Sequence, residues 1–89
     1  MIAERAVTIQ NTLGLHVRPS AAFAGMASKF HSSVSVIKDG QTVNAKSSID
    51  LLTLAAVAGT CLTLRAEGDD AAQAVEALAG LIDSKFGED

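Results

Sequence analysis

The chain has 89 residues, of which 48% are hydrophobic, and a formal net charge of −3 at pH 7. This length fits one small domain, residues 1–89. The negative charge and the absence of Trp and Tyr argue against nucleic acid as the main partner. The single cysteine, Cys61, excludes an internal disulfide and suits a reducing compartment. Neither a signal-peptide pattern nor a membrane-spanning apolar run is present, so we expect a cytoplasmic protein without membrane insertion.

The first third of the chain predicts a strand, a loop and a helix. Residues 4–10 alternate around Val7 and Ile9 and favour a strand. The loop that follows leads to Pro19, which suits the first turn of a helix because its missing N–H costs nothing there. Apolar residues then recur at helical spacing from Ser20 to about Phe30.

The remainder predicts three more strands and two more helices. Val34 and Val36 indicate a second strand, Asp39-Gly40 is a hairpin turn, and residues 41–45 form the returning strand. A short helix is expected over residues 47–56, ended by Gly59. Residues 60–66 alternate as a fourth strand, and residues 71–85 form the last helix, started by Asp69-Asp70. The tail, residues 87–89, is expected to fray.

This βαββαβα order in so short a chain indicates an α+β two-layer fold. An antiparallel sheet would carry helices on one face and leave the other face wet. Polar residues at alternate strand positions support the wet face; they are Thr8, Ser35, Thr63 and Arg65.

The segment His16-Val17-Arg18-Pro19 combines three features that favour phosphate chemistry. A helix N-terminus offers free backbone N–H groups and a positive dipole end. The Arg18 guanidinium matches phosphate oxygens, and His16 supplies a nucleophilic ring nitrogen. A lone histidine before a helix would otherwise be interpreted as a cap or surface residue. No metal-ligand cluster, cofactor motif or nucleophile–base set is visible, so we expect no metal, no cofactor and no stand-alone catalysis.

Two stretches together resemble the HPr family, the histidine phosphocarriers of the bacterial phosphoenolpyruvate-dependent sugar phosphotransferase system. The first runs from Asn11 to Ala21 and contains Gly-Leu-His-Val-Arg-Pro. The second is Val43-Asn44-Ala45-Lys46-Ser47, followed by a leucine-rich helix. The resemblance covers nearly the whole chain and implies a monomeric open-faced β-sandwich, with three helices on one face of a four-stranded sheet ordered 1-4-2-3.

The resemblance also implies a relay. Enzyme I would pass a phosphoryl group to Nδ1 of His16, which would pass it to a sugar-specific enzyme IIA. Arg18 matches the family's active-site arginine. The Val17 and Arg18 N–H groups would bind the phosphate lightly, and Pro19 would support the site without donating a hydrogen bond.

Ser47 has two interpretations. It is a plausible helix N-cap, with Asp50 as its capping-box partner. It also matches the serine that an HPr kinase/phosphorylase modifies in some family members. Regulated members usually carry two bulky apolar residues next, where this chain has Ser48-Ile49.

Partner docking in the family uses the first two helices. The matching apolar positions here are Val17, Ala21, Ile49 and Leu52. Some members place lysines on this surface where this chain has Gly25, Ser28 and Asp50, which bears on partner choice.

Three function classes compete at this point. The first is a sugar relay, with a nitrogen-related or regulatory phosphorelay as its close variant. The second is a regulatory binding protein acting through Ser47 alone, against which the presence of His16 counts. The third is an unrelated α+β binding module in which the motif occurs by chance. His31 and Cys61 are expected to be surface residues without a functional role.

Overall fold

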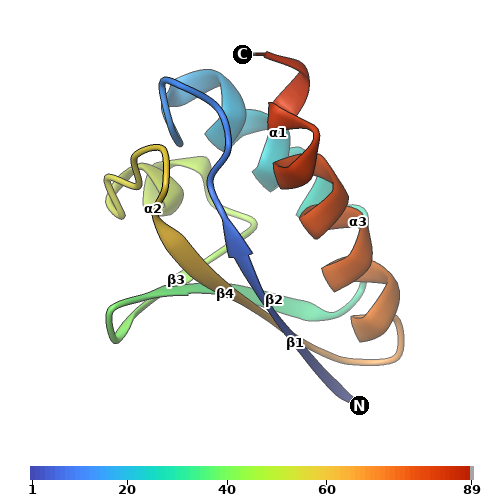
Figure 1. Ribbon diagram of the computed structural model, residues 1–89. Coiled ribbons are helices and arrows are strands. Elements are labelled where there is room, and N and C mark those ends of the chain that lie inside the picture. Colours follow the sequence, from blue (N-terminus) through green and yellow to red (C-terminus); the bar gives the residue numbers. More distant parts are fainter. Residues whose placement is uncertain (89) are drawn as a thin grey trace.

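The computed structural model describes residues 1–88, in which helices cover one face of a four-stranded antiparallel sheet (Figure 1). The elements are β1 (Ile2–Thr8), α1 (Val17–Ala27), β2 (Ser33–Lys38), β3 (Gln41–Asn44), α2 (Ser48–Leu52), β4 (Cys61–Glu67), α3 (Ala71–Asp83) and a 3-10 turn η1 (Lys85–Gly87). The α+β class and the βαββαβα order are confirmed.

The sheet order is β1-β4-β2-β3, as the family resemblance implies. Antiparallel pairing aligns Val7 with Leu62 and Val36 with Leu64, so these side chains share one face. All four are buried. The alternate residues Thr8, Ser35, Thr63 and Arg65 keep partial exposure on the opposite face, which confirms the predicted wet side of the sheet.

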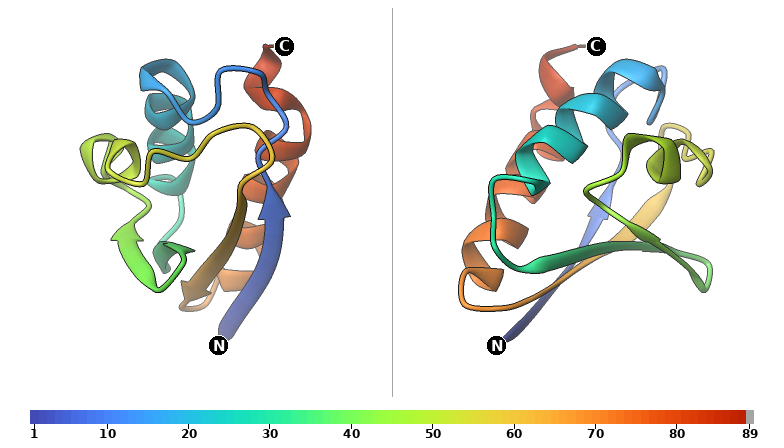
Figure 2. Two further views of the ribbon diagram at one scale, coloured as in Figure 1. Left: turned by 60° about the vertical axis from the view of Figure 1, so that its left-hand side comes forward. Right: turned by 180° about the vertical axis from the view of Figure 1, so that it is seen from behind.

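The helices form the second layer. Helix α3 lies along β1 and β4 (Figure 2) and buries its apolar stripe there, including Val75, Leu78 and Ile82. Helix α1 packs against α2 and α3 and buries Phe23 and Ala27. No helix within residues 1–88 has the length and apolarity needed to cross a bilayer.

The predicted bounds of the first strand and the first two helices need correction. Strand β1 covers residues 2–8 instead of 4–10, and α1 covers 17–27 instead of 20–30. Residues 28–30 follow α1 in tighter turns, where the N–H of Phe30 bonds the carbonyl of Ala27. Helix α2 ends at Leu52, well before Gly59, because similar turns follow and Ala55 takes a φ of +49°.

Asp70 lies before α3 as predicted, but its carboxylate does not cap that helix. It accepts hydrogen bonds from the His31 N–H (2.8 Å) and from the N–H (2.9 Å) and hydroxyl (2.5 Å) of Ser32. The side chain therefore joins the start of α3 to the loop before β2. The ring of His31 is exposed, as expected.

The end of the chain differs most from the expectation. Helix α3 stops at Asp83, and the predicted last turn is replaced by η1. Lys85 and Phe86 both take left-handed φ values, +59° and +55°. This turn brings Glu88 against the loop before α1, so Glu88 is held in place and does not fray. Residue 89 lies outside the described residues.

Candidate functional site

His16 is the N-cap residue of α1. Its backbone is extended (φ −80°, ψ −166°), its carbonyl accepts from the Ser20 N–H at 3.0 Å, and its side chain makes no capping hydrogen bond. The imidazole therefore projects from the helix start without being used to cap it, and 35% of it is exposed. Because α1 begins at Val17, the N–H groups of Val17 and Arg18 have no acceptor inside the helix. Pro19 is buried in the first turn, as its sequence position indicates.

The loop that carries His16 is held by a backbone hydrogen bond to Ala56 and by a side-chain hydrogen bond within the loop itself. The Leu15 N–H donates to the Ala56 carbonyl at 2.8 Å, and the Asn11 side-chain amide donates to the Gly14 carbonyl at 2.7 Å. Gly14 has a φ of +70°, and a Cβ there would collide with the Ala56 carbonyl oxygen. A glycine is therefore required for the loop to lie this close.

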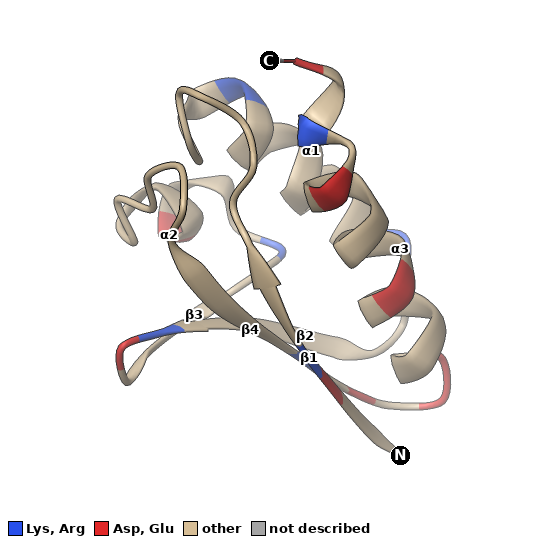
Figure 3. Cartoon of the chain, viewed as in Figure 1, with Lys and Arg blue, Asp and Glu red and all other residues tan. Residues whose placement is uncertain are grey.

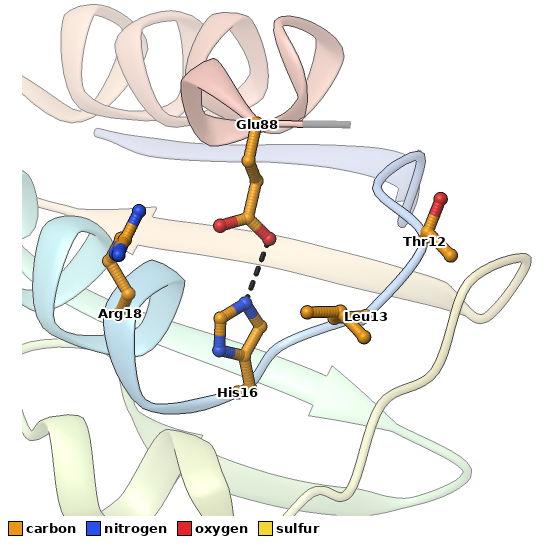
Figure 4. A pocket seen from close by; sticks show the side chains of 5 residues that line it. All are labelled: Thr12, Leu13, His16, Arg18 and Glu88. Carbon is orange, nitrogen blue, oxygen red and sulfur yellow. Dashed lines mark hydrogen bonds and ion pairs between the residues drawn. The ribbon is translucent and has the colours of Figure 1, made fainter.

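Glu88 is the residue that the sequence did not reveal. Its Oε1 lies 2.8 Å from Nε2 of His16 and 2.8 Å from Nδ2 of Asn11 (Figure 4). Its side chain is 18% exposed. The hydrogen bond from His16, then that from Asn11, lowers the pKa of Glu88, and the positive charges of His16 and Arg18 add to this effect. Glu88 and His16 are 72 positions apart, so no local pattern could have paired them.

These groups line one cleft of about 450 Å³, formed by Thr12, Leu13, His16, Arg18 and Glu88. Asn11, which donates to Glu88 of this cleft, is fully buried, and its Oδ1 has no hydrogen-bond partner within residues 1–88. Arg18 is exposed and takes part in no ion pair among the described residues. The cleft therefore combines a nucleophilic ring, an exposed guanidinium and free helix N–H groups.

An exposed apolar rim lies on the elements around His16. Val17 is 70% exposed, Ile49 74% and Leu52 38%, and Ala21 is also exposed. Leu13 and Val57 on the neighbouring loops are also open to solvent. All four predicted docking positions are thus exposed on α1 and α2, which pack against each other. An apolar surface of this kind is typical of an interaction site.

Ser47 is the N-cap of α2. Its hydroxyl oxygen accepts the Asp50 N–H at 3.2 Å, which confirms the cap. The reciprocal half of the capping box is absent, since the Ser47 N–H donates to the Asn44 carbonyl instead. The Ser47 hydroxyl is half-buried and engaged in the structure of the helix start.

Charge is spread over several elements. Basic residues lie on α1, on the strands and near the end of α3 (Figure 3), so no element of the described chain concentrates positive charge. Within residues 1–88 no three His, Cys, Asp or Glu side chains are grouped to hold a metal ion. Cys61 is exposed and free.

The family model "PTS HPr component phosphorylation site" matches residues 3–84. This chain belongs to the HPr family. It is 45% identical to the phosphocarrier protein HPr of Neisseria meningitidis serogroup A over 85 residues, 96% of each chain. A crystal structure of HPr from Thermoanaerobacter tengcongensis matches with a TM-score of 0.94 and 47% identity, covering 98% of each chain.

Two further similar proteins carry different descriptions. The phosphocarrier protein NPr of Shewanella violacea is 39% identical over 96% of this chain and 93% of its own length. A second T. tengcongensis structure, described as an HPr dimer, is 49% identical with a TM-score of 0.79 and covers 92% of this chain and 94% of that chain. The two curated relatives are thus both named phosphocarrier proteins, and the two solved structures are both described as HPr.

Proposed function

We propose that this HPr family member carries a phosphoryl group on Nδ1 of His16. It takes the group from phosphorylated enzyme I and passes it to a sugar-specific enzyme IIA. The observation that carries this proposal is the position of His16: it is the N-cap of an 11-residue helix, yet its ring is not used for capping and lies in a cleft with Arg18. The nucleophile is therefore already oriented and open to a partner.

The transfer needs no further reactant. The Nδ1 lone pair attacks phosphorus, the N–P bond forms, and the bond to the donor atom of enzyme I breaks with its electron pair on that atom. Enzyme IIA receives the group by the reverse of this step. Such transfer requires mainly in-line positioning and charge stabilisation.

The phosphoryl group would be bound by few groups. The N–H groups of Val17 and Arg18 and the positive end of α1 favour its negative charge, and the Arg18 guanidinium can approach from solvent. Pro19 starts the helix but cannot donate. Weak binding of the phosphoryl group suits a carrier, because a strongly stabilised group would not be passed on.

The partners would dock on the apolar rim formed by Val17, Ala21, Ile49 and Leu52. We further propose that residues 1–89 act as one monomeric domain in the cytoplasm, as a carrier and not as a stand-alone enzyme. Each of the two partners must reach the same exposed His16 side chain, one after the other, and a monomer leaves this side chain accessible to both. Sedimentation analysis tests this, and a dimer in solution, the state named for one related structure, would contradict it.

The experiment is incubation with phosphoenolpyruvate, magnesium and the enzyme I of the same organism, followed by intact mass measurement. We expect one acid-labile phosphoryl group on the native chain and none on His16→Ala. No mass gain on the native chain would overturn the proposal.

A second candidate is a nitrogen-related or regulatory phosphorelay using the same His16 chemistry. The similarity to the phosphocarrier named NPr supports this second candidate. Affinity capture of the cognate enzyme I separates the two: an enzyme I that serves sugar enzymes IIA supports the sugar relay, and a different one supports the second candidate.

Regulation at Ser47 by an HPr kinase/phosphorylase is a separate proposal from the family resemblance. A phosphate at the start of α2 would be favoured by the helix dipole and opposed by Asp50 nearby. Incubation with the kinase and ATP tests it, with Ser47→Ala as control; an acid-stable phosphate absent from the variant is expected.

A further inference from the structure

The structure places a carboxylate on the ring nitrogen of His16 that the transfer does not use. Glu88 Oε1 lies 2.8 Å from Nε2, while Nδ1 lies on the side of the ring away from Glu88 (Figure 4). No hydrogen bond within residues 1–88 engages Nδ1. The two nitrogens of this ring therefore have different surroundings.

The contact determines which nitrogen carries the proton. An ionised carboxylate can only accept hydrogen bonds, and the surroundings of Glu88 favour its ionised form. Nε2 must then be the donor, so the neutral ring holds its hydrogen on Nε2 and keeps a free lone pair on Nδ1.

Glu88 is itself held in one orientation. The same Oε1 accepts from Nδ2 of Asn11 at 2.8 Å, and that amide also donates to the Gly14 carbonyl at 2.7 Å. Both neighbours of Nδ2 are acceptors, which fixes the orientation of the fully buried Asn11 amide. A chain of hydrogen bonds thus runs from the rigid Gly14 loop through Asn11 and Glu88 to His16.

We propose that Glu88 is a positioning residue for phosphoryl transfer, holding the His16 ring in the Nε2–H tautomer with Nδ1 presented to the incoming phosphorus. This inference rests on the proposed function of His16. When the N–P bond forms at Nδ1, the ring becomes a cation and its proton stays on Nε2, facing the Glu88 carboxylate. When the group leaves, the electron pair returns to Nδ1 and the ring is neutral again, so no proton needs to be exchanged with solvent.

The proposed role of Glu88 also assigns a function to the C-terminal turn η1. Lys85 and Phe86 adopt left-handed conformations that side-chain-bearing residues rarely take. This turn directs Glu88 back to the start of α1. The turn also contributes to the fold, because Phe86 is partly buried and packs against the hydrophobic core.

The first test reads the tautomer in the protein alone. The ring 15N chemical shifts of His16 are measured in alkaline buffer for the native chain, Glu88→Ala and Glu88→Gln. We expect a protonated Nε2 and an unprotonated Nδ1 in the native chain, mixed tautomers in Glu88→Ala, and an intermediate result in Glu88→Gln, whose amide oxygen can still accept. Identical ring shifts in all three would overturn the proposal.

The second test is the rate of transfer from phosphorylated enzyme I. Outer-shell groups that orient metal-binding histidines typically matter by about 10–100-fold. By analogy, we expect kcat to fall roughly tenfold in Glu88→Ala with KM little changed. Glu76→Gln, the same chemical change as Glu88→Gln on the exposed side of α3, should behave as the native chain. A residue that merely anchors the tail would lower Tm without altering the ring shifts or kcat.

The two proposals fail separately. If the native chain accepts phosphate on His16 but Glu88→Ala transfers at the native rate, Glu88 has no positioning role and the carrier function stands. If the native chain is not phosphorylated at His16, the carrier function itself is wrong, whatever the ring shifts show.

Discussion

The carboxylate of Asp70 binds Ser32 twice, through the backbone N–H at 2.9 Å and the hydroxyl at 2.5 Å. Ser32 is buried, and the two residues lie 38 positions apart. The contact joins the start of α3 to the start of β2 at one end of the sandwich. It lowers the pKa of Asp70 to about 2 from an ordinary value of 3.8, with the Ser32 hydroxyl as the largest cause and the His31 N–H as the next.

Asp70 should make stability depend on acid pH. A carboxyl group with a lowered pKa stabilises the fold above its ordinary pKa, and this contribution is lost as pH falls through the folded value. We therefore expect Asp70→Asn to have a lower Tm than the native chain at pH 7. The gap between the two proteins should narrow between about pH 4 and pH 2.

Thermal unfolding at several pH values measures this gap. The neighbouring change Asp69→Asn is the control, since that exposed carboxylate makes none of these hydrogen bonds within the described residues. Melting curves of the native chain and Asp70→Asn that stay equally far apart from pH 7 to pH 2 would contradict the argument.

Gly14→Ala should destabilise the protein. The new Cβ would take a left-handed conformation and also collide with the Ala56 carbonyl. We expect a loss of roughly 2–4 kcal/mol, combining backbone strain with overpacking. Urea denaturation measures the loss.

Gly40→Ala is the matched control for this change. Gly40 also has a positive φ, +84°, but a Cβ there would meet open space. Its loss should be only about 1 kcal/mol. Equal losses at the two positions would show that close packing of the His16 loop is unimportant.

Ser47→Ala should remove the cap of α2. Its hydroxyl accepts the Asp50 N–H, and losing such a cap commonly costs about 1 kcal/mol. Ser47→Asn keeps an acceptor at the same place and should stay within a few tenths of a kcal/mol of the native chain. Denaturant unfolding of the two variants measures whether the Ser47 hydroxyl stabilises α2. Equal stability of all three proteins would argue against a structural cap and for a serine whose only role is modification.

Ile49→Ser should weaken partner docking without unfolding the protein. Ile49 is 74% exposed, so its removal should change stability by less than about 0.5 kcal/mol. We expect kcat/KM with enzyme I to fall about tenfold, chiefly through KM, because an exposed apolar anchor is lost.

Ile2→Ser provides the comparison. Ile2 is 53% exposed but lies at the start of β1, away from the His16 loop (Figure 1). Its variant should transfer at the native rate. An equal fall in both variants would mean that apolar exposure in general, and not the rim around His16, governs the encounter.

Much of the fold follows from local patterns. Alternation at residues 60–66 and helical spacing at 71–85 predicted elements that the structure contains, because burial on one face imposes those periods. The predicted ends of the helices and strands were less accurate. Tight turns after Ala27 and Leu52 replace the helical turns that apolar spacing and the stop signal at Gly59 favoured, and they depend on what the chain packs against next. The strand order came from family resemblance and not from periodicity.

The sequence by itself was enough to propose His16 as the nucleophile and to place its nearest support: His16, Arg18 and the helix start at Val17 are adjacent in the chain, so their chemistry is local. Only the tertiary structure decided that Glu88 faces Nε2 and that Asp70 holds Ser32. Both contacts join residues tens of positions apart. Glu88 depends in addition on left-handed backbone at Lys85 and Phe86, a conformation that neither residue type signals. A polar contact of this kind exists only once packing has fixed both backbones, which is why the proton on His16 could be assigned from the fold and not from the motif.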